Sequence, residues 1–159
     1  MKLKIITLLI ASGVLVAACD QPLETKTDAS KPAVADRYDR TTVALHRLEQ
    51  GKALFQKNCA ACHGSDAQGA GDWRQRDKDG KYPPPPLDGT AHTWHHPKKA
   101  LMYTIKNGTA AIGGTMPAWK EKLSDDEIES IILWFQAKWP DKLFQAWVKR
   151  DQESRKRTR

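Results

Sequence analysis

The stretch Cys59-Ala60-Ala61-Cys62-His63 decides how this chain is interpreted. It places two thiols three positions apart and an imidazole directly after the second thiol. This C-x-x-C-H spacing is typical of c-type haem attachment, in which each thiol forms a thioether with a vinyl group of the haem. The imidazole is then held beneath the ring, where one of its nitrogens can ligate the iron. The pattern therefore predicts one covalent haem c, bound through Cys59, Cys62 and His63.

Two other interpretations of the same cysteines are weaker. A thioredoxin-like redox pair follows a strand and opens a helix, whereas the residues before Cys59 have a helical pattern. A zinc site needs a second pair of ligands. The one remaining cysteine, Cys19, belongs to a different signal at the start of the chain.

That signal directs export and is predicted over residues 1–18. Lys2 and Lys4 form a basic end, an apolar run follows, and two alanines lead directly into Cys19. The run Val16-Ala17-Ala18-Cys19 resembles the lipobox of bacterial lipoproteins, which implies cleavage before Cys19 and its acylation. The alternative is an ordinary signal peptide cleaved after residue 18, which would leave Cys19 as an odd free thiol.

Residues 19–40 comprise the lipidated cysteine and a polar segment without apolar periodicity, which predicts a flexible tether. A tether of this length has a root-mean-square span on the order of 25 Å. Asp20 resembles the inner-membrane retention signal of some lipoproteins. We therefore expect a location on the periplasmic side of a bacterial membrane, with the inner membrane favoured. Removal of residues 1–18 deletes two lysines and no acids, so the net charge falls from +7 to +5.

Residues 41–140 are expected to form a single domain, because the segment is short and has no internal repeat. Its first helix is predicted from about Thr41 to Lys57, with one apolar face. Gly51 lies inside that helix and lowers its helix propensity, which indicates a close packing contact. The apolar face consists of Leu45, Leu48 and Phe55.

The last helix of this domain has the clearest signals. The run Ser124-Asp125-Asp126-Glu127 forms a capping box and places acids at the positive end of the helix. Apolar residues then recur at helical spacing, and Pro140 ends the pattern. These core positions are Ile128, Ile131, Ile132, Phe135 and Trp139.

Together these features resemble class I cytochrome c. The resemblance rests on Gly51 and Phe55 ahead of the C-x-x-C-H stretch, with Ile131 and Trp134 on the last helix. It covers about residues 41–139 and implies an all-α fold wrapped around one covalent haem. In that family the first and last helices cross at a glycine against a large aromatic residue, so Gly51 and Trp134 would be that pair.

The run Pro85-Pro86-Leu87-Asp88-Gly89 resembles a Pro-x-Leu-x-Gly segment of the same family. The resemblance implies that the Pro85 carbonyl accepts a hydrogen bond from His63, and that Leu87 belongs to the haem environment. Such a bond fixes the imidazole tautomer and tunes the metal. Four consecutive prolines leave this register open by one residue.

A carrier of this kind also needs a sixth iron ligand. Of the two methionines beyond the export signal, Met102 lies in an amphipathic helical stretch, 98–106, which predicts a packing role. Met116 lies in the turn-rich segment 113–119, where glycines allow close backbone approach. This segment resembles the family's Met-Pro distal loop, which implies Met116 as the second axial ligand, with Trp119 in the haem environment.

Two further features stand out. Residues 64–84 form a polar loop that contains Trp73, and a solvated loop is the preferred interpretation. His92, His95 and His96 lie within five residues and are candidates to bind copper or zinc. The alternatives are a wet surface loop or replacement of Met116 by His95 or His96 as iron ligand.

Residues 141–159 form an amphipathic, basic C-terminal extension. Its apolar stripe, formed by Leu143, Phe144, Trp147 and Val148, is predicted to pack back on the domain. Residues 149–159 hold six basic and two acidic side chains, a net charge of +4. This end is either disordered or interacts with anionic phospholipid or an acidic partner. Nucleic acid is not an expected partner for an exported protein.

The sequence thus predicts a membrane-anchored, monomeric electron carrier and not an enzyme. With His63 and Met116 in both axial positions, no vacancy is left for a substrate. The expected partners are a reductase and a terminal oxidase or dehydrogenase. One alternative is a haem-based redox or ligand sensor in which Met116 dissociates. Another is the electron-accepting subunit of a periplasmic dehydrogenase or copper oxidase.

Overall fold

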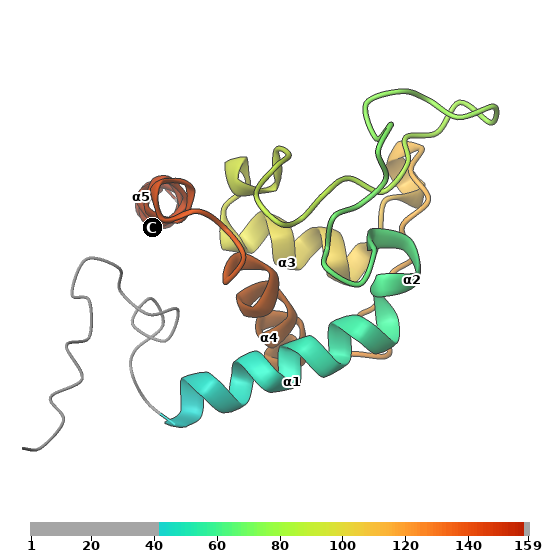
Figure 1. Ribbon diagram of the computed structural model, residues 1–159. Coiled ribbons are helices and arrows are strands. Elements are labelled where there is room, and N and C mark those ends of the chain that lie inside the picture. Colours follow the sequence, from blue (N-terminus) through green and yellow to red (C-terminus); the bar gives the residue numbers. More distant parts are fainter. Residues whose placement is uncertain (1–41, 158–159) are drawn as a thin grey trace, which may run out of the picture. The chain divides into compact units, whose positions relative to one another are not determined.

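A computed structural model describes residues 42–157 of the chain (Figure 1). Over this range the structure is helical and contains no strand, so the predicted all-α class is confirmed. The predicted export signal, the acylated Cys19 and the tether lie outside the described residues. No helix between residues 42 and 157 combines the length and apolar character that crossing a membrane requires. The elements are α1 (Thr42–Asn58), α2 (Ala60–His63), η2 (Thr93–His95), α3 (Lys98–Asn107), η3 (Ala110–Ile112), α4 (Asp125–Gln136) and α5 (Asp141–Arg157).

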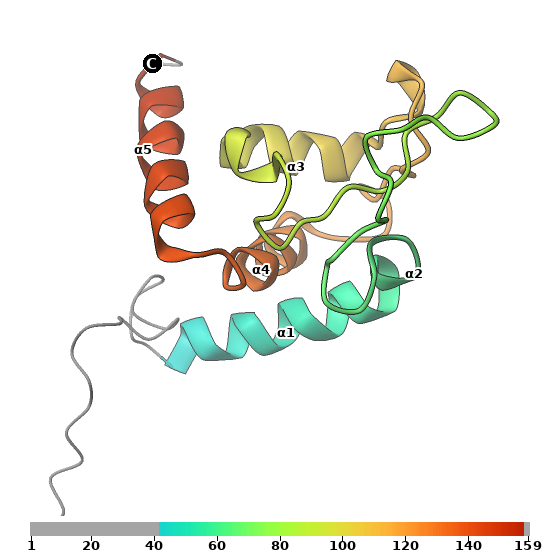
Figure 2. The same cartoon turned by 45° about the horizontal axis from the view of Figure 1, so that its top comes forward.

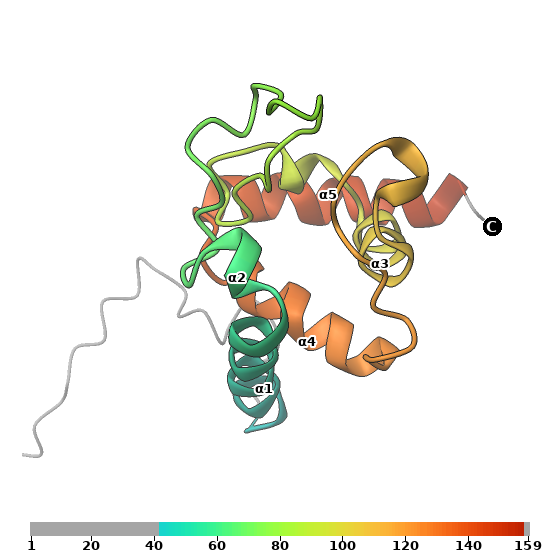
Figure 3. The same cartoon turned by 90° about the vertical axis from the view of Figure 1, so that its right-hand side faces the viewer.

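Helices α1 and α4 cross and form the most extensive contact between two elements of the described residues (Figures 2 and 3). A Cβ atom at position 51 would overlap the Ser130 carbonyl and lie 3.1 Å from the Trp134 Cβ, so only glycine fits there. One turn further along α1, the ring of Phe55 lies 4.5 Å from that of Trp134 between centroids. The predicted contact of Gly51 with Trp134 is confirmed.

The predicted apolar face of α1 is correct at one end and wrong at the other. Phe55 is fully buried, whereas Leu45 is 53% exposed. Two residues further along α1, the Arg47 guanidinium reaches α4, where it donates to Ser130 Oγ at 3.3 Å and pairs with Glu129 at 3.3 Å. Leu45 precedes that contact, and periodicity alone does not reveal where the partner helix begins.

Helix α4 starts with the predicted capping box. Ser124 Oγ accepts from the Glu127 amide at 3.3 Å, and Glu127 Oε2 accepts from the Ser124 amide at 2.8 Å. The bonds that the Ser124 amide and the Ser124 hydroxyl donate to Glu127 Oε2 lower the pKa of Glu127, because they stabilise its carboxylate. The prediction of a helix that Pro140 ends is wrong in detail, since α4 ends at Gln136 and a turn follows. That turn lets the Trp139 indole donate to the Leu87 carbonyl at 2.7 Å.

Helix α3 agrees with the predicted stretch 98–106, and Met102 packs against the hydrophobic core as expected. The helix ends at Gly108, which has a left-handed φ of 69°. At its start, the Lys98 amide donates to Asp151 Oδ1 on α5 at 2.8 Å. A side chain 53 positions away thus satisfies one of the free amides at the beginning of α3.

Helix α5 packs on the domain through its apolar stripe, as predicted. Phe144 and Trp147 are buried, and the Trp147 indole donates to the His96 carbonyl at 2.8 Å. The expectation of a disordered end is wrong as far as Arg157, because the helix continues to that residue. Figure 2 shows α5 beside α3, on the side away from α2.

Candidate functional site

The C-x-x-C-H stretch forms one turn of helix directly after α1. The His63 amide donates to the Cys59 carbonyl at 2.9 Å, which winds the five residues into a compact unit. Both cysteines are free, with Cys59 half-buried and Cys62 exposed. Burial, together with the neighbouring Cys62, raises the pKa of Cys59 to about 11, so its thiol is neutral at physiological pH. Neither sulfur is committed to a disulfide, so both are available for thioether formation.

The His63 side chain is buried and fixed by one hydrogen bond. Its Nδ1 lies 3.0 Å from the Pro85 carbonyl oxygen, as expected, and this resolves the register of the proline run. A carbonyl only accepts, so Nδ1 carries the proton and Nε2 keeps its lone pair. Burial lowers the pKa of His63, and the bond to Pro85 opposes this only in part. The imidazole is thus held neutral, in the tautomer that binds a metal through Nε2.

Residues 84–87, here named the proline strap, are fastened to the loop that follows His63. The Ala70 amide donates to the Pro84 carbonyl at 2.9 Å, and the Leu87 amide donates to the Ala67 carbonyl at 2.7 Å. Between these bonds lies Gly69, with a φ of 65°. Its Cβ, if present, would be 2.5 Å from the Pro85 carbonyl carbon. Only glycine at this position lets the strap approach closely enough to reach His63.

The methionine loop, residues 108–119, is fastened mainly through its backbone. The Met116 amide donates to Thr109 Oγ1 at 3.0 Å, and the Thr109 amide donates to the Met116 carbonyl at 2.9 Å. Gly108 lies against the same backbone, since a Cβ there would be 2.5 Å from Met116 O and 2.7 Å from the Pro117 carbonyl carbon. The Met116 side chain is half-buried.

Of the three residues predicted to belong to the haem environment, Pro85 bonds to His63, and Leu87 and Trp119 border the core. Leu87 and Trp119 are partly buried and pack against it. The Trp119 amide donates to the Ile105 carbonyl of α3 at 3.1 Å, and Lys122 Nζ lies 5.5 Å from the Trp119 ring centroid. Trp119 therefore fixes the end of the methionine loop against α3.

Each of the three histidines in residues 92–96 contacts another aromatic ring. The ring of His95 lies 3.8 Å from Trp94, and that of His92 lies 5.2 Å from Trp73, both between centroids. His92 and His96 meet edge to face at 5.5 Å. In the part of the chain that the structure describes, no group of three or more His, Cys, Asp or Glu side chains is placed to hold a metal ion. The copper or zinc interpretation therefore has no geometric support.

Gly69, Gly108 and Thr109 are the functional residues that sequence reasoning missed. A glycine just beyond a predicted helix marks Gly108 only as a place where that helix ends. Nothing in the sequence distinguishes Gly69 and Thr109 from ordinary loop residues. Their contacts with Pro85 and Met116 appear only once the loops are folded.

This donor set fits a covalent haem. Cys59 and Cys62 supply two free thiols, His63 presents a neutral imidazole with Nε2 unprotonated, and Met116 supplies a thioether from a fixed backbone. A soft sulfur and an imidazole are a known axial pair for haem iron.

Comparisons with known proteins agree with this geometry. The family described as cytochrome c oxidase, cbb3-type, subunit III matches residues 46–135. The chain is 38% identical over 88 residues to the cbb3-type cytochrome c oxidase subunit CcoP of Azospirillum sp. (strain B510), which covers 55% of this chain and 27% of that subunit. The chain thus spans about a quarter of the length of the CcoP subunits it matches.

Two shorter relatives match over most of their length. Cytochrome c6 of Cladophora glomerata is 35% identical over 86 residues, which is 53% of this chain and 80% of the relative. Cytochrome c-551 of Bacillus subtilis is 28% identical over 137 residues, which is 86% of this chain and 96% of the relative. No solved structure gave a significant match. The chain therefore belongs to the class I, mono-haem cytochromes c, in the family described as subunit III of the cbb3-type oxidase, and its cofactor is one covalent haem c.

Proposed function

We propose that this protein carries single electrons, with Cys59 and Cys62 joined to the haem and with His63 and Met116 as the two axial ligands. The observation that carries the proposal is the bond from His63 Nδ1 to the Pro85 carbonyl. It leaves Nε2 unprotonated and holds the ring in one orientation. When bound, haem c supplies a one-electron couple at its iron.

The ligand residues favour transfer over catalysis. The Met116 thioether is a soft ligand, so it favours the reduced state and raises the reduction potential relative to a pair of histidines. His63 stays neutral because it is buried, and its bond to Pro85 keeps the same tautomer in both redox states. With both axial positions filled from the chain, no site remains for a substrate.

A carbon monoxide test separates the carrier from the sensor alternative. The reduced, haem-loaded protein is expected to show no spectral change under carbon monoxide, and its redox titration is expected to follow a single one-electron curve. Met116→Ala is expected to bind carbon monoxide readily, because it opens one axial position. Ready binding by the parent protein would contradict the carrier proposal and favour a sensor.

A second candidate function is that of an electron-transferring subunit of a terminal oxidase. The match to the cbb3 subunit III family over residues 46–135 favours it, as does the likeness to CcoP. Stable co-purification of an oxidase from gently solubilised membranes would support this candidate. A protein that purifies alone yet is oxidised by those membranes would support the freely diffusing carrier.

We further propose that the protein is exported and held at the periplasmic face of the membrane by a lipid on Cys19. The support is the run Val16-Ala17-Ala18-Cys19, which ends a basic and then apolar leader. Mass spectrometry of the mature N-terminus is expected to show an acylated Cys19. The Cys19→Ser variant is expected to leave the membrane fraction in a wash of about 1 M salt, which screens any attraction to charged lipid, whereas the acylated parent stays bound. An unmodified N-terminus would contradict the anchor.

A further inference from the structure

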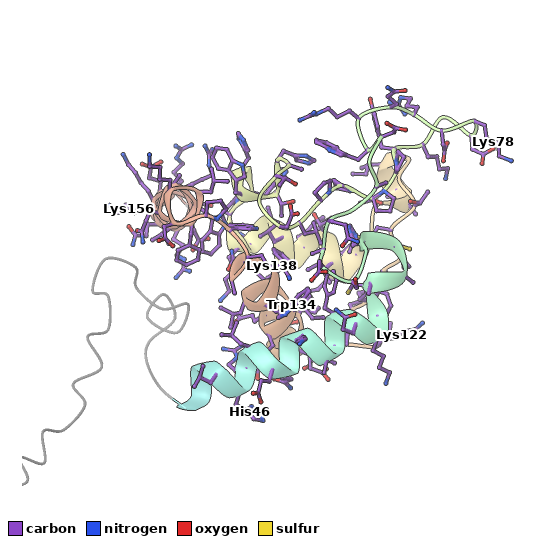
Figure 4. All side chains as sticks on the ribbon, viewed as in Figure 1. His46, Lys78, Lys122, Trp134, Lys138 and Lys156 are labelled. Carbon is purple, nitrogen blue, oxygen red and sulfur yellow. The ribbon has the colours of Figure 1, made fainter. Side chains whose placement is uncertain are left out.

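The outer face of α5 carries a straight row of cations. Lys142, Lys149 and Lys156 follow one another at intervals of seven residues, which brings each back to nearly the same side of the helix. From the first to the last, the row is about 21 Å long at the α-helical rise. Arg150 and Arg157 each follow a lysine of the row and lie about 100° further around the helix, both on the same side of the row. All five side chains are exposed. These five residues are named the basic stripe, and Figure 4 shows Lys156 pointing away from the rest of the domain.

The opposite face of α5 is fully used in packing. Phe144 and Trp147 are buried, and Asp151 is 5% exposed where it accepts the Lys98 amide. The helix therefore cannot turn over to insert its apolar side into a membrane or a partner. The basic stripe and its exposed neighbours on α5 are presented outward.

Within residues 42–157, the stripe differs from three cations nearby, Lys98, Lys106 and Arg155, each of which pairs with a carboxylate. In the groove of about 470 Å³ between α3 and α5, Lys106 pairs with Asp125 at 2.7 Å and Arg155 pairs with Asp151. Lys98, which also lines the groove, pairs with Glu129 at 2.7 Å. Among residues 42–157, none of the five stripe residues forms such a pair.

The composition of this face identifies the kind of surface that it fits. Protein interfaces are depleted in lysine and depend on buried aromatic anchors. The stripe is dominated by lysine, and its exposed neighbours, Gln145, Ala146 and Gln152, include no large apolar side chain. Glu153 is the one exposed acidic residue of α5 within the described range. A long, flat, cationic row without an apolar anchor is complementary to a plane of negative charge.

We propose that the basic stripe of α5 lies on the headgroups of anionic phospholipids. This contact would fix the orientation of the domain as well as its distance from the membrane. Figures 1 and 2 show α3 between α5 and α2, so a domain resting on α5 holds the C-x-x-C-H turn away from the lipid. The contact is independent of acylation at Cys19 and of the axial ligands.

The test uses the full, haem-loaded chain with Cys19→Ser, so that no acyl group contributes. Flotation with vesicles that contain phosphatidylglycerol is compared with flotation on vesicles of phosphatidylcholine alone. We expect binding to the anionic vesicles only, and its loss at about 1 M salt, where the screening length is about 3 Å. A lysine near an anionic surface strengthens binding roughly fivefold, so the triple variant K142Q/K149Q/K156Q is expected to bind roughly a hundredfold more weakly.

A matched control separates the stripe from net charge. K52Q/K57Q/K78Q removes the same charge from exposed lysines of α1 and of the loop after α2, and is expected to bind nearly as well as the parent. Helical circular dichroism and the haem spectrum check that both variants fold. Equal losses in the two variants, or no binding of the parent to anionic vesicles, would overturn the proposal. Retention on immobilised poly-glutamate that depends on the stripe, without vesicle binding, would overturn it in favour of an acidic protein partner.

Discussion

The His63 side and the Met116 side of the site are both held tightly, but by different atoms. On the His63 side the ligand's own ring is fixed, because Nδ1 donates to the Pro85 carbonyl at 3.0 Å. On the Met116 side the structure fixes the backbone through Thr109, and a thioether has no strong hydrogen bond to make. These contacts therefore set the orientation of His63, the proposed ligand on one side. They set only the location of Met116, the proposed ligand on the other side, so we expect Met116 to be released first.

Gly69→Ala is expected to have the largest effect, because it attacks the proline strap. The new methyl group would press on the Pro84–Pro86 backbone while alanine is forced into a left-handed φ of 65°. Overpacking and backbone strain together cost about 3 kcal/mol or more of the free energy of unfolding. Denaturant titration of the haem-loaded variant measures the loss, and a redox titration is expected to show an altered potential.

Gly80→Ala is the matched control for that change. Gly80 has a φ of 74°, but a Cβ there would meet no atom within 4 Å. Gly80→Ala is expected to lower the free energy of unfolding by about 1–2 kcal/mol, from backbone strain alone. Its reduction potential is expected to be unchanged. If Gly69→Ala and Gly80→Ala lower the free energy of unfolding equally, the claim that Gly69 positions the strap is contradicted.

Gly108→Ala makes the corresponding change on the Met116 side. It is expected to lower the free energy of unfolding by about 2–3 kcal/mol. The added Cβ would lie 2.5 Å from the Met116 carbonyl oxygen and shift the ligand's backbone. The weak far-red absorption band of sulfur–iron(III) ligation is expected to fade, which Gly69→Ala should not cause. Gly113→Ala, with a φ of 81° and open space, serves as control. If the far-red band persists in Gly108→Ala, the claim that Gly108 positions Met116 is wrong.

Thr109→Val tests the hydroxyl that accepts the Met116 amide. Loss of this acceptor is expected to lower the free energy of unfolding by about 1–2 kcal/mol, since it leaves the Met116 amide without a partner in a partly buried segment. Carbon monoxide binding to the reduced protein is expected to become detectable, because Met116 dissociates more often. Thr109→Ser keeps the acceptor and should restore the parent behaviour. If both variants bind carbon monoxide equally, the hydroxyl has no positioning role.

Lys122→Gln is expected to have the smallest effect, about 0.5 kcal/mol of unfolding free energy. It removes the cation that lies 5.5 Å from the Trp119 ring at the end of the methionine loop. Lys120→Gln, at an exposed position in the same segment, is the control and should be neutral. A loss above about 1 kcal/mol in thermal unfolding would show that the loop depends on this contact more than exposed cation–π pairs allow.

Features with a local signal could be predicted from the sequence. The capping box starts α4 at Asp125, and an internal glycine in α1 marks the crossing with Trp134. The likeness of the proline run to a known segment placed Pro85 on His63. The capping box implies its contacts through residue type alone, whereas the partners Trp134 for Gly51 and His63 for Pro85 were implied by the family resemblance.

Features that depend on distant contacts could not be predicted. Helix α4 stops at Gln136 although the apolar spacing continues, and the turn that follows places the Trp139 indole on the Leu87 carbonyl, 52 positions earlier. The end of α5 is ordered as far as Arg157, and its buried Asp151 is bound to the start of α3. Gly69 acts on a strap that a long loop separates from it. Periodicity and composition do not contain these pairings.

The most direct test of the central claim is the absorption spectrum of the oxidised, haem-loaded protein. Met116→Ala is compared with Met102→Ala, which removes a methionine that packs on the core from α3. The account predicts a weak far-red charge-transfer band in the parent and in Met102→Ala, and its absence in Met116→Ala. A parent without this band, or a band that disappears in Met102→Ala and persists in Met116→Ala, would contradict the ligand pair His63 and Met116.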